Sequence, residues 1–124
     1  MLWIGFGIAG VVAIGLVFIG GRFLLQPRAA ARAFGIPDSE LTAHNPFWAV
    51  KGVRDLGVAL LIGVLVLGGS AHLLAWGLLL GALIPIGDCL IVLRSGGTRL
   101  AAVGIHGLTA AVLLAAAALL FVAH

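Results

Sequence analysis

The stretch Pro46-Phe47-Trp48-Ala49-Val50-Lys51-Gly52-Val53-Arg54-Asp55-Leu56 places three ionisable side chains within five residues, directly before an uncharged run. That run, residues 56–67, is twelve residues long and covers roughly 18 Å as a helix at ~1.5 Å per residue. A bilayer core of about 30 Å requires a longer helix, so the span must begin near Trp48. Lys51, Arg54 and Asp55 are therefore predicted to lie within the membrane or at its inner edge, where ionisable groups are costly and usually functional.

The composition of the 124-residue chain predicts an integral membrane protein. Hydrophobic residues make up 63% and charged residues 9% of the sequence, the mean hydropathy is +1.29, and long apolar stretches recur along the chain. A soluble domain would need more polar surface, and a membrane barrel would need alternating hydrophobicity. The basic balance is explained by cations that flank apolar spans, so no nucleic-acid partner is expected. The single cysteine, Cys89, excludes an internal disulfide.

The predicted fold is all-α, a single membrane domain over residues 1–124 that forms a four-helix transmembrane bundle. A short interfacial helix at about 27–34 is expected to lie flat on the membrane surface between the first two spans. The short connection at 68–72 predicts an antiparallel hairpin, and Pro85 allows a kink inside the third span. The expected spans are about 3–25, 48–67, 73–93 and 100–122.

The seven Lys and Arg residues all fall on one side of this arrangement. By the positive-inside tendency that side is cytoplasmic, so both termini are expected to be extracytoplasmic, in a membrane of the bacterial inner (plasma) type. Since the cations follow the first span and do not precede it, that span is not expected to be a secretory signal. The cations are Arg22, Arg28, Arg32, Lys51, Arg54, Arg94 and Arg99.

The polar residues of three spans are predicted to lie at a common depth. Asp88 comes six residues before Arg94, roughly 9 Å inward, and Asp55 and His106 lie seven residues after Trp48 and Arg99, roughly 10 Å inward. Groups of opposite charge at one depth can neutralise each other, which is the usual condition for keeping charges in a membrane. We therefore expect one polar pocket that opens toward the cytoplasm.

Within this pocket Asp55, Asp88 and His106 are the candidate catalytic residues, acting as acid, base or cation stabiliser. Lys51 and Asp55 can pair on one helix face, whereas Arg54 points about 100° away, toward Asp88, lipid phosphate or a ligand. Structural roles remain open, because cations near a helix end can snorkel to phosphates and buried ion pairs can fix helix register. The expected substrate-binding residues are Arg22, Trp48, Lys51, Arg54 and Thr109.

No cofactor and no metal are expected. One histidine and two carboxylates have the composition of a metal-binding facial triad, but no ligand pair at i,i+3 or i,i+4 supports it.

Several short motifs resemble a known family. They include Phe34-Gly35-Ile36-Pro37, Lys51-Gly52-Val53-Arg54-Asp55-Leu56, Ile84-Pro85 with Gly87-Asp88, and Gly104-Ile105-His106-Gly107-Leu108-Thr109-Ala110. From about Arg22 to the last span, the chain resembles the small four-span membrane proteins called domain of unknown function 4267, with a distant similarity to DoxX-like four-helix proteins. The resemblance implies a compact bundle and no particular activity.

The sequence is compatible with three functions, of which only the first includes an enzyme. The first is a membrane enzyme of isomerase, cyclase or hydratase type, or a binding pocket, for a lipophilic small molecule that enters from the bilayer. The second is a non-catalytic assembly or partner protein in which the charges serve stability. The third is a proton-coupled transporter working as a homo-oligomer.

Overall fold

The computed structural model describes residues 1–41 and 45–123. These residues are 88% helical and include no strand, which confirms the all-α prediction. In chain order the elements are α1 (Leu2–Leu25), α2 (Pro27–Phe34), the 3-10 turn η1 (Asp38–Glu40), α3 (Pro46–Leu67), α4 (Ala71–Gly81), α5 (Leu83–Arg94), the π-helical η2 (Leu100–Gly107) and α6 (Leu108–Ala123).

Three helical stretches in the described part of the chain are long and apolar enough to cross a membrane. They are Leu2–Leu25, Ala71–Arg94 and Leu100–Ala123, each of 24 residues. At 1.5 Å per residue such a helix is about 36 Å long, which exceeds the hydrocarbon core of a bilayer. Large apolar side chains on their outer faces are exposed, as at Val11 and Ile14, each more than 70% exposed. The chain is accordingly an integral membrane protein.

Helix α3 is almost as long, at 22 residues, but it carries Lys51, Arg54 and Asp55. Its start at Pro46, two residues before the expected span, follows from a local cap. The side chain of Asn45 accepts a hydrogen bond from the Phe47 backbone N–H, with an N···O distance of 3.0 Å, and Pro46 occupies the first helical position.

The third span is interrupted near its middle. Helix α4 ends at Gly81 and α5 begins at Leu83, and this break lies one turn before Pro85. Proline has no backbone N–H, so the Gly81 carbonyl, four residues earlier, loses its helical partner. The proline therefore explains why the span divides into two helices here.

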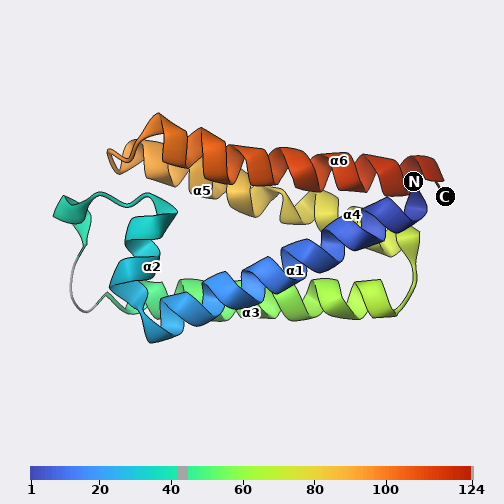
Figure 1. Cartoon of the computed structure of the whole chain (residues 1–124), viewed down its shortest axis with the longest axis horizontal. Helices are drawn as coiled ribbons and strands as arrows, with labels where there is room; N and C mark the ends of the chain where they lie inside the picture. The colour runs from blue at the N-terminus through green and yellow to red at the C-terminus, as the bar shows by residue number, and fades with distance from the viewer. Residues whose placement is uncertain (42–44, 124) are drawn as a thin grey trace.

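Helix α3 runs along one side of the molecule, and α5, η2 and α6 run along the other (Figure 1). Both termini lie at one end, where α1 packs against α6 and α4 also packs against α6. From there α1 crosses diagonally to α3, and the two backbones approach closely at Gly20 and Gly52. At the opposite end α2 runs across the long axis, between α1 and α3 on one side and α5 and η2 on the other.

Two apolar clusters hold these ends. The larger lies where α1, α3, α4 and α6 meet and includes Leu74, Leu78 and Leu120, all nearly inaccessible to solvent. The smaller docks α2 through Ala30 and Ala31 against Phe23 of α1. Since α2 buries these alanines against α1, it packs into the bundle and also closes one end of it.

Candidate functional site

Two cations and two carboxylates form an ion network between α3 and α5. Lys51 Nζ lies 2.8 Å from Asp55 Oδ2 and 3.8 Å from Asp88 Oδ2. Arg54 Nη2 lies 3.3 Å from Asp55 Oδ1 and 3.6 Å from Asp88 Oδ1. Asp55 is 2% exposed and Asp88 8%. Each carboxylate thus faces both cations, and the formal charges of the network cancel.

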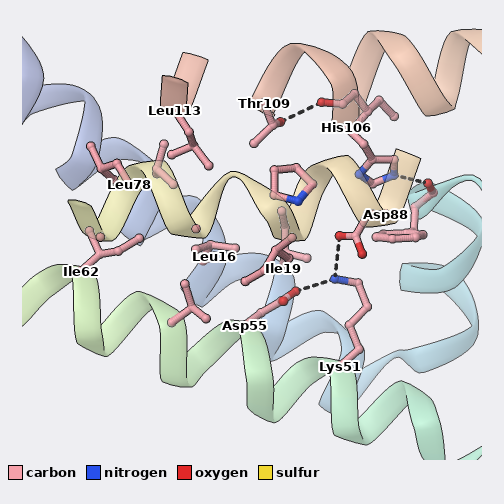
Figure 2. A pocket seen from close by; sticks show the side chains of 18 residues that line it. Leu16, Ile19, Lys51, Asp55, Ile62, Leu78, Asp88, His106, Thr109 and Leu113 are labelled. Atoms are coloured by element: carbon pink, nitrogen blue, oxygen red, sulfur yellow. Dashed lines mark hydrogen bonds and ion pairs between the residues drawn. The ribbon is translucent and has the colours of Figure 1, made fainter. Parts of the chain in front are cut away.

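The positions of these groups follow from local sequence. Lys51 and Asp55 are one turn apart on α3 and point to the same side, as their spacing predicts (Figure 2). Asp88 lies one turn beyond Pro85 on α5 and faces Lys51 across the bundle. Arg54 reaches Asp88, as proposed from its direction on the helix, but its long side chain also bends back to Asp55.

Aromatic rings surround the Lys51 ammonium group. Its Nζ lies 4.6 Å from the ring centroid of Phe34 and 4.9 Å from that of Phe23. Both distances are within the range of a cation–π interaction, which stabilises a cation held away from water. The end of α2 therefore contributes directly to the charged group.

Phe34 is placed by the C-terminal cap of α2. Gly35 follows with a φ of 110°, a conformation that favours glycine, and Ile36 N–H donates to the Ala31 carbonyl over 3.1 Å. Carbonyls in the last turn of a helix lack partners within the helix. The Phe34 carbonyl finds its partner in His106, whose Nε2 lies 2.8 Å away.

This contact orients His106. A carbonyl oxygen only accepts hydrogen bonds, so Nε2 must carry the proton and donate. In the neutral ring Nδ1 is then unprotonated and available as a base or hydrogen-bond acceptor. The ring is held further by Phe34, with centroids 4.2 Å apart, and His106 is 7% exposed.

His106 lies in the π-helical segment η2, where an ordinary apolar span was expected. Thr109 follows in α6, and its hydroxyl donates to the Ile105 carbonyl over 2.7 Å. Such wider turns are rare in helices and are found frequently at functional sites. The sequence of 100–107 contains no proline or other signal that would have predicted it.

A cavity of about 110 Å³, which we call the central cavity, lies between α1 and α3 on one side and α4, α5, η2 and α6 on the other. Its polar lining comes from Lys51, Asp55, Asp88, His106 and Thr109, which Figure 2 shows around one side of the space. A comparable apolar cavity of about 150 Å³ accepts a benzene-sized ligand. The remaining lining is Val12, Leu16, Ile19, Phe34, Val58, Ile62, Gly77, Leu78, Gly81, Ile84, Pro85, Ile105 and Leu113.

The other expected site residues lie elsewhere. Arg22 lines a second, adjoining cavity. Arg54 touches the carboxylates from outside the lining, with a side chain that is 41% exposed. Trp48 packs against Phe23, with centroids 6.3 Å apart, and borders a separate shallow hollow. Phe34, which contacts both Lys51 and His106, was not among the expected site residues, although the motif Phe34-Gly35-Ile36-Pro37 and its place at the end of a short helix could have drawn attention to it.

Among the described residues, no three His, Cys, Asp or Glu side chains are arranged to hold a metal ion.

Comparison with known proteins identifies one family. The model of a family described as a domain of unknown function (DUF4267) matches residues 13–120, which confirms the resemblance seen in the short motifs. No curated protein and no solved structure matches the chain. The matched interval includes the whole ion network, Phe34, His106 and Thr109.

Proposed function

We propose that this chain, which belongs to the DUF4267 family, binds a lipophilic small molecule in the central cavity and carries out acid–base chemistry on it. The observation that carries this proposal is a single cavity whose wall is mostly apolar and whose polar side chains come from four different helical elements. Ligand sites are typically concave and apolar, with a few convergent polar groups that fix orientation.

Helix α3 is proposed as the fourth span of the bundle. Its 22 residues give about 33 Å at 1.5 Å per residue, enough to cross the hydrocarbon core. Its three charges lie in the half nearer α2, and pairing with Asp88 of α5 neutralises them. Ionisable residues inside membranes typically face the bundle interior and pair with one another in this way.

The cations support an orientation with the α2 end in the cytoplasm. Arg28 and Arg32 lie on α2, and Arg94 ends α5 at the same end of the molecule. By the positive-inside tendency this end is cytoplasmic, which leaves both termini extracytoplasmic in a bacterial inner membrane. The polar side of the cavity then lies in the cytoplasmic half of the bilayer.

The proposed chemistry depends on how tightly each carboxylate is held by the two cations. Asp55 holds Lys51 at 2.8 Å, whereas both cations stand farther from Asp88, at 3.6 and 3.8 Å. Asp88 and the unprotonated Nδ1 of His106 are therefore both assigned as proton acceptors, and the group that takes a proton from the substrate then returns it at another position of the substrate. Lys51 would stabilise negative charge that develops on a substrate oxygen. Isomerisation, cyclisation or hydration of a lipophilic substrate requires no more than these groups.

The test fills the cavity and examines what co-purifies with the protein. Gly81 lines the central cavity, and a Cβ added there meets no atom within 4 Å, so Gly81→Leu should fill the space without a backbone clash. Gly57→Leu is the matched control, because Gly57 is exposed on α3 and also has open space around it. Extracts of each purified protein are compared with bulk lipid by mass spectrometry.

We expect a lipophilic compound enriched over bulk lipid in the wild type and in Gly57→Leu, and lost in Gly81→Leu. If nothing is enriched, or if Gly81→Leu retains the same compound, the central cavity is not a ligand site.

The complete pairing of the ion network favours a second candidate, a non-catalytic membrane partner protein in which the charges fix helix register. The double variant Lys51→Met with Asp55→Leu separates the two candidates. Replacement of a buried pair by apolar residues of similar size is often neutral for stability. A folded double variant that loses the enriched compound supports the ligand site, whereas unchanged compound and lost partner binding support the second candidate.

A further inference from the structure

A second cavity, of about 100 Å³, lies between α1, α2 and η2 and is called here the side cavity. Four residues, Ile19, Phe34, Ile105 and His106, line both this cavity and the central cavity. The two cavities therefore adjoin at these shared side chains. The side cavity is completed by Arg22, Phe23, Ala30 and Ala33.

Arg22 is the charged group of the side cavity, and it is half-buried. Its guanidinium lies 5.9 Å from the ring centroid of Phe18 on its own helix. Within the described part of the chain no carboxylate pairs with Arg22: Asp55 and Asp88 pair with Lys51 and Arg54, Asp38 pairs with Arg32, and Glu40 forms no ion pair with it. A cation near the apolar core without a counter-ion is costly, and an anion bound there removes that cost.

The chemistry of Arg22 limits what the anion can be. The planar guanidinium offers paired N–H donors that match the oxygens of a carboxylate or a phosphate. The rest of the side cavity is aromatic and aliphatic. A ligand that fits has a single oxyanion at one end and an apolar body.

We propose that the ligand of the central cavity is an amphipathic acid, whose carboxylate or phosphate binds Arg22 while its apolar tail passes Phe34 and His106 into the central cavity. This inference rests on the proposed function and adds the class of substrate. It places the atoms that follow the head group beside His106, which lines both cavities, and the tail beyond them in the central cavity that Asp88 lines.

The test is competition for photo-labelling of the purified full-length protein. The probe is a decanol with a diazirine in its chain, and unlabelled decanoate and decanol compete for labelling of peptides that line the central cavity. The two competitors have the same tail length and differ in charge. The ratio of their half-inhibitory concentrations is compared between variants, so that differences in membrane partitioning cancel.

In the wild type decanoate should compete at a roughly tenfold lower concentration than decanol, as expected for a charge-assisted pair. Arg22→Gln should abolish this preference and Arg22→Lys should restore part of it. Arg28→Gln is the control, because Arg28 is exposed on α2 and lines neither cavity. Equal competition by acid and alcohol in the wild type, or an equal loss in Arg28→Gln, would overturn the inference.

The same experiment separates this inference from the function on which it rests. If Gly81→Leu blocks labelling by the decanol probe but decanoate competes no better than decanol, the proposed function is supported and the inference that the ligand is an acid is wrong. Labelling that neither decanoate nor decanol reduces contradicts both the proposed function and this inference.

A lipid phosphate and a free acid share the chemistry that Arg22 would bind. The competition is therefore run in maltoside micelles, which lack phosphate, and in nanodiscs of phosphatidylglycerol. A preference for decanoate in both media assigns the site to a free acid. A preference that phosphatidylglycerol suppresses assigns it to the lipid head group.

Discussion

Asp55 is the residue on which the ion network depends most. It is 2% exposed and contacts both Lys51 and Arg54 at 3.3 Å or less. Removal of one partner from a buried pair leaves charge uncompensated, so Asp55→Asn should lower the free energy of unfolding by roughly 3–5 kcal/mol. Denaturation of the purified protein in mixed micelles measures this change.

The matched control is Asp38→Asn. Asp38 pairs with Arg32 at 2.9 Å, about the distance of the Lys51–Asp55 pair, but its side chain is 71% exposed. An exposed pair contributes about 1 kcal/mol or less, so this variant should be nearly as stable as the wild type. Equal losses of unfolding free energy in Asp55→Asn and Asp38→Asn would mean that burial does not determine how much these ion pairs stabilise the protein.

The tautomer of His106 can be observed directly. Because Nε2 faces the Phe34 carbonyl at 2.8 Å, the neutral ring should carry its proton on Nε2 and leave Nδ1 bare. Nitrogen-15 chemical shifts of the labelled imidazole distinguish the two tautomers. A proton on Nδ1 in the neutral ring would exclude the hydrogen bond to Phe34 and with it the assignment of Nδ1 as a base.

Among the elements, α1 and α3 show the closest packing of helix backbones. A Cβ built at Gly52 would lie 2.8 Å from the Gly20 carbonyl oxygen and 2.9 Å from a side-chain carbon of Leu24. Gly52→Ala should therefore separate the helices and destabilise the protein by roughly 1–3 kcal/mol. Gly57→Ala, on the same helix with no atom within 4 Å, should be neutral or more stable by up to about 1 kcal/mol.

Unfolding of both glycine variants under the same conditions decides this point. If Gly52→Ala is as stable as Gly57→Ala, the two helices do not depend on contact at this glycine pair.

The helices and the ion network could be predicted from sequence to different degrees. The long apolar stretches have clear ends, since glycine, proline and arginine interrupt them, and the Lys51–Asp55 pair follows from a spacing of four. The contact between His106 and the Phe34 carbonyl joins residues 72 positions apart. It depends on how α2 folds across the end of the bundle, which no local pattern encodes.

The bend of Arg54 and the π-helical turn were also beyond sequence reasoning. Adjacent residues on a helix point in directions about 100° apart, so contact between Arg54 and Asp55 requires a particular path of a long flexible side chain. The residues of η2 are as apolar as those of an ordinary span. It packs chiefly against α5 and continues directly into α6, so no local pattern in its sequence marks the wider turns.

At the scale of the whole molecule, the arrangement of the termini makes the orientation testable. Ala123 is exposed beside the terminal end of the bundle, and Ser39 is exposed near α2 at the opposite end. In a background in which Cys89 is replaced by serine, Ala123→Cys should react with an impermeant maleimide in intact spheroplasts. Ser39→Cys should react only after the membrane is permeabilised. The reverse pattern would invert the proposed topology and place the polar side of the cavity outside.

The charges of α3 also affect how the protein is made. On the scale of translocon-mediated insertion, a charged residue at the centre of a helix costs roughly 2.5–3.5 kcal/mol, and α3 carries three. Helices α1, α4 with α5, and η2 with α6 are long and apolar enough to cross a membrane, so on the same scale their insertion should be favourable. Helix α3 gains its last partner, Asp88, only when α5 has been synthesised. During biosynthesis α3 should therefore stay at the translocon, packed against α1, until α4 and α5 have been synthesised. The helices should then enter the lipid bilayer together.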